Sequence, residues 1–592
     1  MIYNKAKQYA LPVLMVVQAL LLFSYYPSIP FSHDELSAIT RCRFGNLNDL
    51  FQWGIRPDGH PAGVQLLLYY LIKLLGISEP VLKLPFAIAG CLSLYCLFRI
   101  AEKLFDARAA VFSSLLFIGS QYVLFQMTQA RPYSPGVFFS LAVFYCNLLI
   151  KDKPEKGGRY LLLSILLTAA CYIHYFSFLQ VVVIQGLCTL FYYKHYQKHF
   201  YAVAIALSII CFLPHWPITE YQLSMGGLGW LGPPGFAFFR SFFLNLCNHS
   251  EILLLIFSAA VATGLLYKSA TDKNVLLLLL MFAIPVLVLF LYSRYRAPVM
   301  QDAALYFSIP FLIILSGRAL SYTNKYLYVA SIGITAAAVF GSLFFNTHYL
   351  QYKTYQPMDR FIRTSEQLSA VNKGESALTI WKGNHQYLQY FIDKRQFIHP
   401  VVTTDTLKNI SGIDFQAYEF IISNNLEPAD MAALGRVFPF VNASENNYLF
   451  NALILSRKAG GDSLYHTLAN PVFELKTGDS WSAPFVYKLN EKDRFKFLEC
   501  FIQPDTTGTD IELVAETYSG DVMINRNAVP IEANTLLSLK MKDIVMQEPL
   551  KGESFIKFYL WQKNKGHQPH RIHVVLKERR DNPLEYRFSP SH

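Results

Sequence analysis

The chain has 592 residues, of which 53% are apolar and only 16% are charged. Soluble domains average about 25% charged residues, so this deficit is typical of a protein that lies in a membrane. The formal net charge is +11, and residues 1–349 carry all of this excess because residues 350–592 hold 28 basic and 28 acidic side chains. The positive charge therefore belongs to the apolar half of the chain and indicates how that half is oriented in the membrane. A net positive charge confined to the apolar half argues against a nucleic-acid binder, and the length and apolar composition argue against a disordered chain and a small secreted domain.

Apolar stretches divide the first half of the chain into eleven predicted membrane spans. Each approaches the roughly 20 residues that a hydrocarbon layer of about 30 Å requires. A cleaved signal peptide does not explain the first stretch, because no small-residue cleavage site follows it and many more spans do. The predicted spans are residues 9–29, 82–104, 109–127, 134–150, 159–174, 177–193, 200–216, 250–267, 274–292, 302–317 and 326–345.

The basic residues between these spans predict the orientation. With eleven crossings, fifteen Lys and Arg residues that flank the spans fall on one side, which the positive-inside rule makes cytoplasmic. The N-terminus is then cytoplasmic, and the opposite side receives residues 31–80, 128–133, 217–249, 293–301 and everything beyond 346. Residues 61–77 are apolar too, but a crossing there would invert every later loop. We therefore expect them to form a helix at the outer interface.

The polar half predicts two outer domains after a transmembrane domain over residues 1–349. Residues 350–460 alternate helical stretches with short strand-like runs (SALTIW, YEFIIS, NALILS), which indicates a small α/β domain. Gly460-Gly461 marks a linker. Residues 461–592 contain strand patterns throughout, including FKFLECFI, DIELVAETY, FIKFYLWQ and RIHVVLKE, and a β-sandwich is the expected closure.

The first predicted outer loop concentrates acids and histidines in a half that has few of them. Asp34 and Glu35 follow the first span, and Asp58 and His60 precede the interfacial helix. Two adjacent carboxylates at a membrane surface repel each other and need partners. A solvated acidic pair at a helix N-terminus is the structural alternative, since the helix dipole stabilises negative charge there.

The other predicted outer loops add arginines and aromatic groups. Arginine offers a permanently charged planar fork suited to phosphate oxygens, although a single one can also be an interfacial anchor. Carboxylates and arginines on one membrane face together indicate an acid/base centre beside a phosphate site. The contributing residues are Arg131 and Tyr133 in TQARPYSPG, His174 in YIHYFS, and Arg294 and Arg296 in YSRYRAPVMQD.

Several other chemistries lack their sequence signals. There is no GxxxxGK[ST] for nucleotide hydrolysis, no GxGxxG after a strand and no HExxH. Nine cysteines include no CxxC pair. A divalent metal held by the acids and histidines of the first outer loop is conceivable from the ligand types, but no recognised spacing supports it, so no cofactor is expected.

The motifs resemble those of a known family. A first span followed by Asp34-Glu35, then HPAGVQLLLYYLIKLLG, KLPFAIAGCLSLYCLFRIAEKLF and QARPYSPGVFF, is similar to the GT-C class of membrane glycosyltransferases. More narrowly it looks like the protein O-mannosyltransferase and aminoarabinose-transferase superfamily, over roughly residues 8–345. The family commonly has HPP or KPP where this chain has His60-Pro61-Ala62, and Thr128–Tyr133 lacks the second-loop acid of some relatives.

The resemblance implies an inverting transfer of a sugar from a polyprenyl-phosphate carrier to an acceptor hydroxyl at the outer side of the membrane. It maps the loop acid of the family onto Asp34 as general base, with Glu35 as a second catalytic acid. Arg131 with Arg294 or Arg296 would hold the carrier phosphate. Asp58, His60, Tyr133 and His174 would complete the substrate site.

Two interpretations of the function that involve no sugar transfer remain open. One is a transporter or lipid-sugar flippase, although no inverted repeat is visible and the acids lie at one face rather than at mid-depth. The other is a polysaccharide-binding assembly protein in which the outer β domain acts. The partners expected in the first reading are the lipid bilayer, a polyprenyl-phosphate sugar and a glycan, lipid or protein acceptor, with no nucleic acid.

Overall fold

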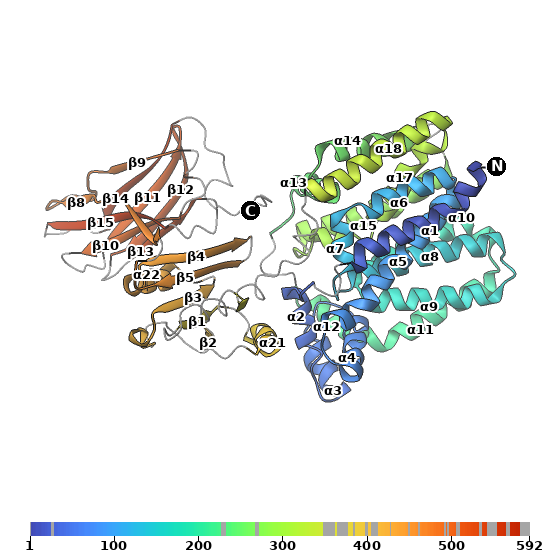
Figure 1. Ribbon diagram of the computed structural model, residues 1–592, viewed down its shortest axis with the longest axis horizontal. Coiled ribbons are helices and arrows are strands. Elements are labelled where there is room, and N and C mark those ends of the chain that lie inside the picture. The colour runs from blue at the N-terminus through green and yellow to red at the C-terminus, as the bar shows by residue number, and fades with distance from the viewer. Residues whose placement is uncertain are drawn as a thin grey trace. The chain divides into compact units, whose positions relative to one another are not determined.

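A computed structural model of the chain divides into two compact units, Met1–Gln356 and Pro357–His592 (Figure 1). Each unit is described by itself. The structure describes residues 2–24, 29–226, 232–266, 272–346, 362–363, 377–382, 385–396, 401–403, 413–424, 426, 428–447, 450–459, 462–490, 493, 497–504, 510–531, 536–541, 553–563 and 569–579. The predicted linker Gly460-Gly461 lies outside these residues.

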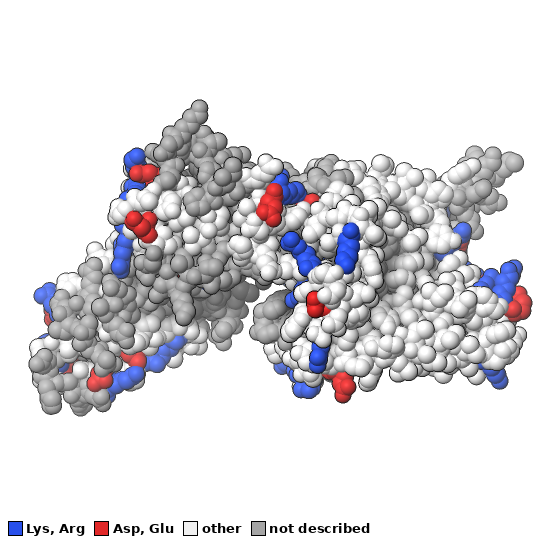
Figure 2. Space-filling model, turned by 90° about the horizontal axis from the view of Figure 1, so that it is seen from below, with Lys and Arg blue, Asp and Glu red and all other residues white. Residues whose placement is uncertain are grey.

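The first unit is a bundle of apolar helices. Its longer helices are α1 (Ile2–Phe23), α5 (Glu79–Leu104), α6 (Ala107–Ile118), α8 (Tyr133–Asp152), α9 (Gly157–Ile173), α10 (Tyr175–Tyr192), α11 (Lys198–Phe212), α14 (Glu251–Leu266), α15 (Lys273–Tyr295), α17 (Ile309–Ser321) and α18 (Lys325–Gly341). Figure 2 shows one face of this unit on which charged side chains are sparse over the helices. Such a surface suits a hydrocarbon environment.

Shorter helices connect the bundle and gather in part at one of its ends (Figure 1). They are α2 (His33–Thr40), α3 (Leu47–Asp49) with the π-helical turn Leu50–Ile55, α4 (Gly63–Leu75), α7 (Gln121–Met127), α12 (Trp216–Ser224), α13 (Ala237–Leu246) and α16 (Asp302–Leu305). Helix α4 has 13 residues and is therefore about 20 Å long, short of the hydrocarbon thickness. It corresponds to the expected interfacial segment.

Every predicted span contains helix, but some are split between two helices and not every helix is long enough to cross a membrane alone. Among the described residues six helices are long and apolar enough to cross a membrane, or up to eight if each of two bent pairs is one span. The chain is thus a helical membrane protein with a β-rich C-terminal unit. The count of eleven crossings stays a prediction.

The predicted span 109–127 is two helices rather than one. Helices α6 and α7 meet at an angle of 74° because Gly119 ends the first and Ser120 caps the second. Helices α13 and α14 are bent by 102° at Asn248 and His249, which both have a φ of 54°. The buried amide of Asn248 joins the two breaks: its Nδ2 donates to the Gly119 carbonyl (2.8 Å), and its Oδ1 accepts from the Gln121 N–H (2.7 Å).

The second unit contains an α/β layer and two further sheets. A six-stranded sheet has the order β2-β1-β3-β5-β4-β6, in which β1 (Ala377–Trp381) pairs in parallel with β2 (Val401–Thr403) and β3 (Phe420–Asn424). Strands β4 (Phe440–Asn447), β5 (Phe450–Ser456) and β6 (Asp462–Ser463) continue it in antiparallel pairing. The helices α21 (His385–Arg395) and α22 (Pro428–Val437) belong to this part of the chain.

The remaining strands form two antiparallel sheets around one core. The first has β13 (Leu536–Lys540), β10 (Phe497–Pro504), β15 (His570–Arg579), β7 (Tyr465–Ala469) and β8 (Val472–Leu475); the second has β12 (Val522–Pro530), β11 (Ile511–Ser519), β14 (Ser554–Gln562) and β9 (Phe485–Leu489). Leu498 and Val574 of the first sheet share a buried cluster with Leu513 and Phe558 of the second. Two sheets that bury a common face form a sandwich.

Candidate active site

Helix α2 begins at a capping box that the sequence Ser32-His33-Asp34-Glu35 encodes. The Ser32 hydroxyl accepts from the Glu35 N–H (3.3 Å), and the Glu35 carboxylate accepts from the Ser32 N–H (2.8 Å). This reciprocal pair satisfies two backbone donors at the start of the helix. The Glu35 side chain is thereby held against the start of the helix, while its neighbour Asp34 lies on another side of the helix.

Glu35 is held inside the helical unit by groups from two other segments. Its carboxylate lies 3.1 Å from the Lys83 ammonium group and accepts from the Ala130 N–H (2.7 Å). Neither charged side chain is exposed. Lys83 belongs to α5, and Ala130 belongs to the loop before α8. The carboxylate thus ties α2 to both of these elements.

Asp34, in contrast, is open to solvent. Its side chain is 67% exposed and lies 3.9 Å from the His33 imidazole. The hydrogen bond with His33 lowers the pKa of Asp34, and the positive charge of Arg131 lowers it further. Partial desolvation by neighbouring atoms acts in the opposite direction, but the pKa still lies below its usual value. The backbone carbonyl of Asp34 also accepts from Arg131 Nη1 (3.4 Å). An ionised, accessible carboxylate therefore stands beside a buried guanidinium group.

Asp58 is buried, and its carboxylate oxygens are occupied by neighbours. Oδ1 accepts from Arg41 Nη1 (2.6 Å) and the Gly59 N–H (3.0 Å), and it lies 3.3 Å from His60 Nδ1. Oδ2 accepts from the side-chain amide of Gln65 on α4. Burial alone would raise the pKa of Asp58, but the charge and hydrogen bond of His60 together with the Arg41 charge hold it well below its usual range. This carboxylate fixes the loop between α2 and α4.

Imidazole and aromatic rings form a wall next to these charges. The His174 ring centroid lies 5.0 Å from that of His60, 6.1 Å from that of Tyr133 and 4.9 Å from that of Phe307. His174 lies in the break between α9 and α10, where its Nδ1 accepts from the Phe176 N–H (3.0 Å). Burial lowers the pKa of His174 well below its ordinary value. The neutral ring therefore carries its proton on Nε2 and can donate from it.

Gln222 of α12 and His215, the residue just before α12, support this wall. The Gln222 side-chain amide donates to the His60 carbonyl (3.0 Å) and to the Ile55 carbonyl (2.7 Å). His215 Nε2 accepts from the Ala62 N–H (3.1 Å), which fixes the turn at His60-Pro61-Ala62. The backbone that carries Asp58 and His60 is thereby held by a helix more than 150 residues away in sequence.

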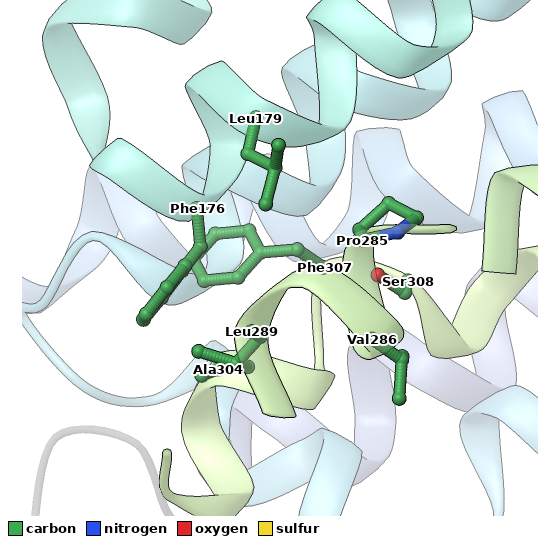
Figure 3. A pocket seen from close by; sticks show the side chains of 8 residues that line it. All are labelled: Phe176, Leu179, Pro285, Val286, Leu289, Ala304, Phe307 and Ser308. Carbon is green, nitrogen blue, oxygen red and sulfur yellow. The ribbon is translucent and has the colours of Figure 1, made fainter. Parts of the chain in front are cut away.

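A small cavity of about 10 Å³, lined mostly by apolar side chains, adjoins the wall at Phe307 (Figure 3). Pro285 interrupts the hydrogen bonding of α15 and frees the Met281 carbonyl, which accepts instead from the Gln180 amide (2.8 Å). The Ser308 hydroxyl in turn donates to Gln180 (2.7 Å). The pocket is lined by Phe176, Leu179, Pro285, Val286, Leu289, Ala304, Phe307 and Ser308.

The structure brings together most, but not all, of the site residues expected from the sequence. Asp34, Asp58, His60, Arg131, Tyr133 and His174 lie in one connected set of contacts. Arg294 and Arg296, at the end of α15, are exposed, and no contact joins them to this set within the described part of the chain. The same part contains no group of three or more His, Cys, Asp or Glu side chains arranged to hold a metal ion.

Comparison with known families bears directly on these residues. Residues 59–218 match the model of the dolichyl-phosphate-mannose-protein mannosyltransferase family. The match confirms the predicted resemblance to GT-C class glycosyltransferases. The matched segment contains His60, Arg131, Tyr133 and His174 of this GT-C-like chain and ends before Arg294. No curated protein matches the sequence significantly.

Two kinds of solved structure are similar to this GT-C-like chain. ArnT from Cupriavidus metallidurans, solved in the apo state and bound to undecaprenyl phosphate, is 12% identical, with a TM-score of 0.48 over 76% of this chain and 98% of that chain. The oligosaccharyltransferase of Archaeoglobus fulgidus in complex with Zn and sulfate is 11% identical, with a TM-score of 0.41 over 75% of this chain and 72% of that chain.

Several residues of the site were not singled out from the sequence. Arg41 and Gln65 bind Asp58, Lys83 pairs with Glu35, and Phe307 packs on His174. The capping box at Ser32 was the one signal available, because S-x-x-E at the start of a helix predicts that the glutamate side chain folds back onto the first turn. The other contacts join residues up to 133 positions apart, as between His174 and Phe307, and no local pattern encodes them.

Proposed function

We propose that this chain is an inverting glycosyltransferase. It moves a sugar from a polyprenyl-phosphate carrier to an acceptor hydroxyl at the outer side of the membrane. The family match supports glycosyl transfer as the reaction class. The donor, the stereochemistry and the side of the membrane belong to this proposal, as do the cytoplasmic N-terminus and the extracytoplasmic position of residues 350–592 in a cell (inner) membrane.

One observation carries the proposal: an exposed carboxylate stands next to a buried guanidinium group that has spare hydrogen-bonding capacity. Arg131 is 8% exposed, and its Nε has no hydrogen-bond partner. A buried unpaired donor is costly, so it favours an anion that can accept from it. A phosphate group that arrives from the bilayer satisfies that need bidentately.

The reaction uses these two groups in one displacement. The acceptor oxygen attacks the anomeric carbon while the bond from that carbon to the phosphate oxygen breaks, so the configuration inverts. Asp34 takes the proton of the attacking hydroxyl, and the polyprenyl phosphate leaves with the electron pair. Arg131 stabilises the charge that grows on the leaving phosphate, a contribution worth about 2.7–4 kcal/mol for a well-placed donor.

The remaining residues of the site either hold its elements in place or face the substrate. Glu35 holds α2 against Lys83, so we assign it a positioning role rather than direct proton transfer. Asp58 fixes His60 through its ring Nδ1. The Nε2–H of His174 and the ring of Tyr133 then face a substrate beside Arg131.

For Arg294 and Arg296 we propose a role other than binding the carrier phosphate in the site. Both are exposed at the C-terminal end of α15, six to eight residues before α16, which leads to the pocket and to Phe307. Exposed guanidinium groups at a membrane surface attract anionic lipids. We propose that they draw the carrier phosphate toward the site before Arg131 binds it.

Transfer of label from donor to acceptor tests the proposal. Purified chain in lipid nanodiscs is incubated with a radiolabelled polyprenyl-phosphate sugar and a cell-envelope extract, and the label in water-soluble and in lipid products is counted. A transferase yields labelled product and free polyprenyl phosphate. A flippase moves the lipid between leaflets without yielding either, and that result would reject the proposal.

A further inference from the structure

The sheet β12-β11-β14-β9 has a second face that the sandwich core does not use. Along β14, Ile556 and Phe558 point into the shared core, while Tyr559 and Trp561 lie on the opposite side. The register places Glu512 of β11 opposite Trp561, and Arg526 of β12 opposite Glu516 of β11. We call this surface the outer face; its members used below are Trp481, Glu512, Glu516, Tyr518, Arg526, Tyr559 and Trp561.

Trp481 is fixed at the edge of the outer face by backbone hydrogen bonds. The Gln562 N–H donates to the Ser480 carbonyl (3.0 Å), and the Ser482 N–H donates to the Leu560 carbonyl (3.1 Å). These bonds place Trp481 directly across from Trp561. The two indole rings are parallel within 16°, with centroids 5.8 Å apart, and Trp481 remains 54% exposed. A large flat ring that is already immobilised loses little entropy when a ligand packs on it.

Polar groups surround the indole pair in fixed positions. The hydroxyls of Tyr559 (2.6 Å) and Tyr518 (2.9 Å) donate to the two carboxylate oxygens of Glu516. The Arg526 guanidinium group lies 5.5 Å from the Trp561 ring centroid and 3.8 Å from Glu516. Lys563 pairs with Glu512 (2.5 Å). The surface therefore offers both donors and acceptors, with its charges paired.

We propose that the outer face binds a glycan chain, with a sugar ring packed on Trp481. A pyranose has one apolar face of C–H groups and a rim of hydroxyls that both donate and accept. An exposed indole complements the C–H face, and charge-assisted hydrogen bonds from the neighbouring carboxylates and cations suit the rim. A nucleic acid or an anionic lipid surface would require unpaired positive charge, whereas Glu512 and Glu516 stand among the cations here.

This site lies in the β-rich unit and goes beyond the proposed function, because it needs no bond chemistry. It is tested by saturation-transfer NMR and calorimetry on the full chain in lipid nanodiscs, free of sugar-headed detergent. The probes are maltohexaose, cellohexaose, chitohexaose and α-1,6-mannohexaose. We expect at least one probe to bind, and Trp481→Ala to weaken that binding at least tenfold. Trp53→Ala removes a 66% exposed tryptophan of the helical unit and serves as the matched control, with unchanged binding.

Three outcomes would overturn the site: no probe binds the wild-type chain, Trp481→Ala binds like wild type, or Trp481→Ala changes only the particle mass in light scattering. The last result assigns the ring to self-association. Because Trp481 is more than half exposed, we expect Trp481→Ala to keep its unfolding temperature. If that temperature falls, a second variant, Trp481→Tyr, decides. It keeps a smaller ring, so binding of the best probe should weaken measurably. An affinity equal to that of the wild type would contradict the proposal.

Discussion

The ammonium group of Lys83 lies 3.1 Å from the carboxylate of Glu35, and both side chains are fully buried. This pair separates two adjacent acids into different environments. Residues one position apart on a helix point about 100° apart, so the contact that buries Glu35 leaves Asp34 at the surface. Helix α5 thereby holds α2 in place, and the carboxylate of Asp34 stays accessible beside Arg131.

Breaking the Lys83–Glu35 pair should destabilise the helical unit more than deleting it. Glu35→Gln and Lys83→Met alone should each cost about 3–5 kcal/mol, because each leaves a buried charge without its partner. The double variant should lose less than the sum of the two. Unfolding in mixed micelles measures all four states of this double-mutant cycle. Additive losses would show that the two groups do not depend on each other.

Asp34→Asn should abolish sugar transfer without affecting folding. Loss of a general base costs about 10²–10⁴-fold in kcat. The side chain is 67% exposed, so the unfolding temperature should stay unchanged. The label-transfer assay measures the rate, and Glu220→Gln, which removes an exposed carboxylate of α12, is the control with full activity. Retention of more than about a tenth of the rate would remove Asp34 as the base.

Arg131→Lys should impair use of the lipid donor although the charge is kept. A lysine supplies a point charge in place of a planar fork, so it loses the bidentate contact to phosphate. We expect kcat/KM for the donor to fall by about 10²–10³-fold, the effect of losing one strong donor to the leaving group. Arg56→Lys is the matched control, because Arg56 is exposed and packs over Tyr221 at 4.4 Å. Equal donor dependence in both variants would assign Arg131 a structural role.

Acidification should destabilise the protein through His174. Its folded pKa is lowered by burial, so below about pH 6.5 the unfolded chain binds a proton that the folded chain does not. Stability is then present above the unfolded pKa and is lost as pH falls, by at most about 1.4 kcal/mol per pH unit. His174→Asn keeps an N-cap acceptor for Phe176 and should flatten the unfolding temperature between pH 7.5 and pH 5.5 relative to wild type. An identical pH slope in both proteins would exclude His174 as the source.

Gly136→Ala should disturb the aromatic wall from behind. A Cβ at Gly136 would lie 2.3 Å from Cε1 of Phe307, the ring that packs on His174. The ring must move, which should cost about 1–3 kcal/mol and lower kcat. Gly333→Ala on α18 meets open space, and it should leave activity unchanged and stability equal or up to about 1 kcal/mol higher. Thermal unfolding and label transfer compare the two variants. Wild-type behaviour of Gly136→Ala would mean that Phe307 has room to shift without consequence.

The sequence by itself determined the helices of the first unit and several strands of the second. Apolar runs of 16–23 residues fold as helices in a membrane because their backbone groups must bond within the segment. Alternating runs such as DIELVAETY became β11, since one face of a sheet is buried and the other is not. Local chemistry also encoded the capping box at Ser32.

Only the tertiary structure decided which charged side chains work together. Asp34 and Glu35 are adjacent carboxylates in the sequence, and the contact that buries only one of them comes from Lys83, 48 positions from Glu35. Asp58 looks like a free loop acid, yet Arg41 and Gln65 occupy it. Such contacts depend on helix packing across long separations, where a side chain meets whatever element the fold brings next to it. The sequence names the chemical groups, and packing decides which of them remain free to react.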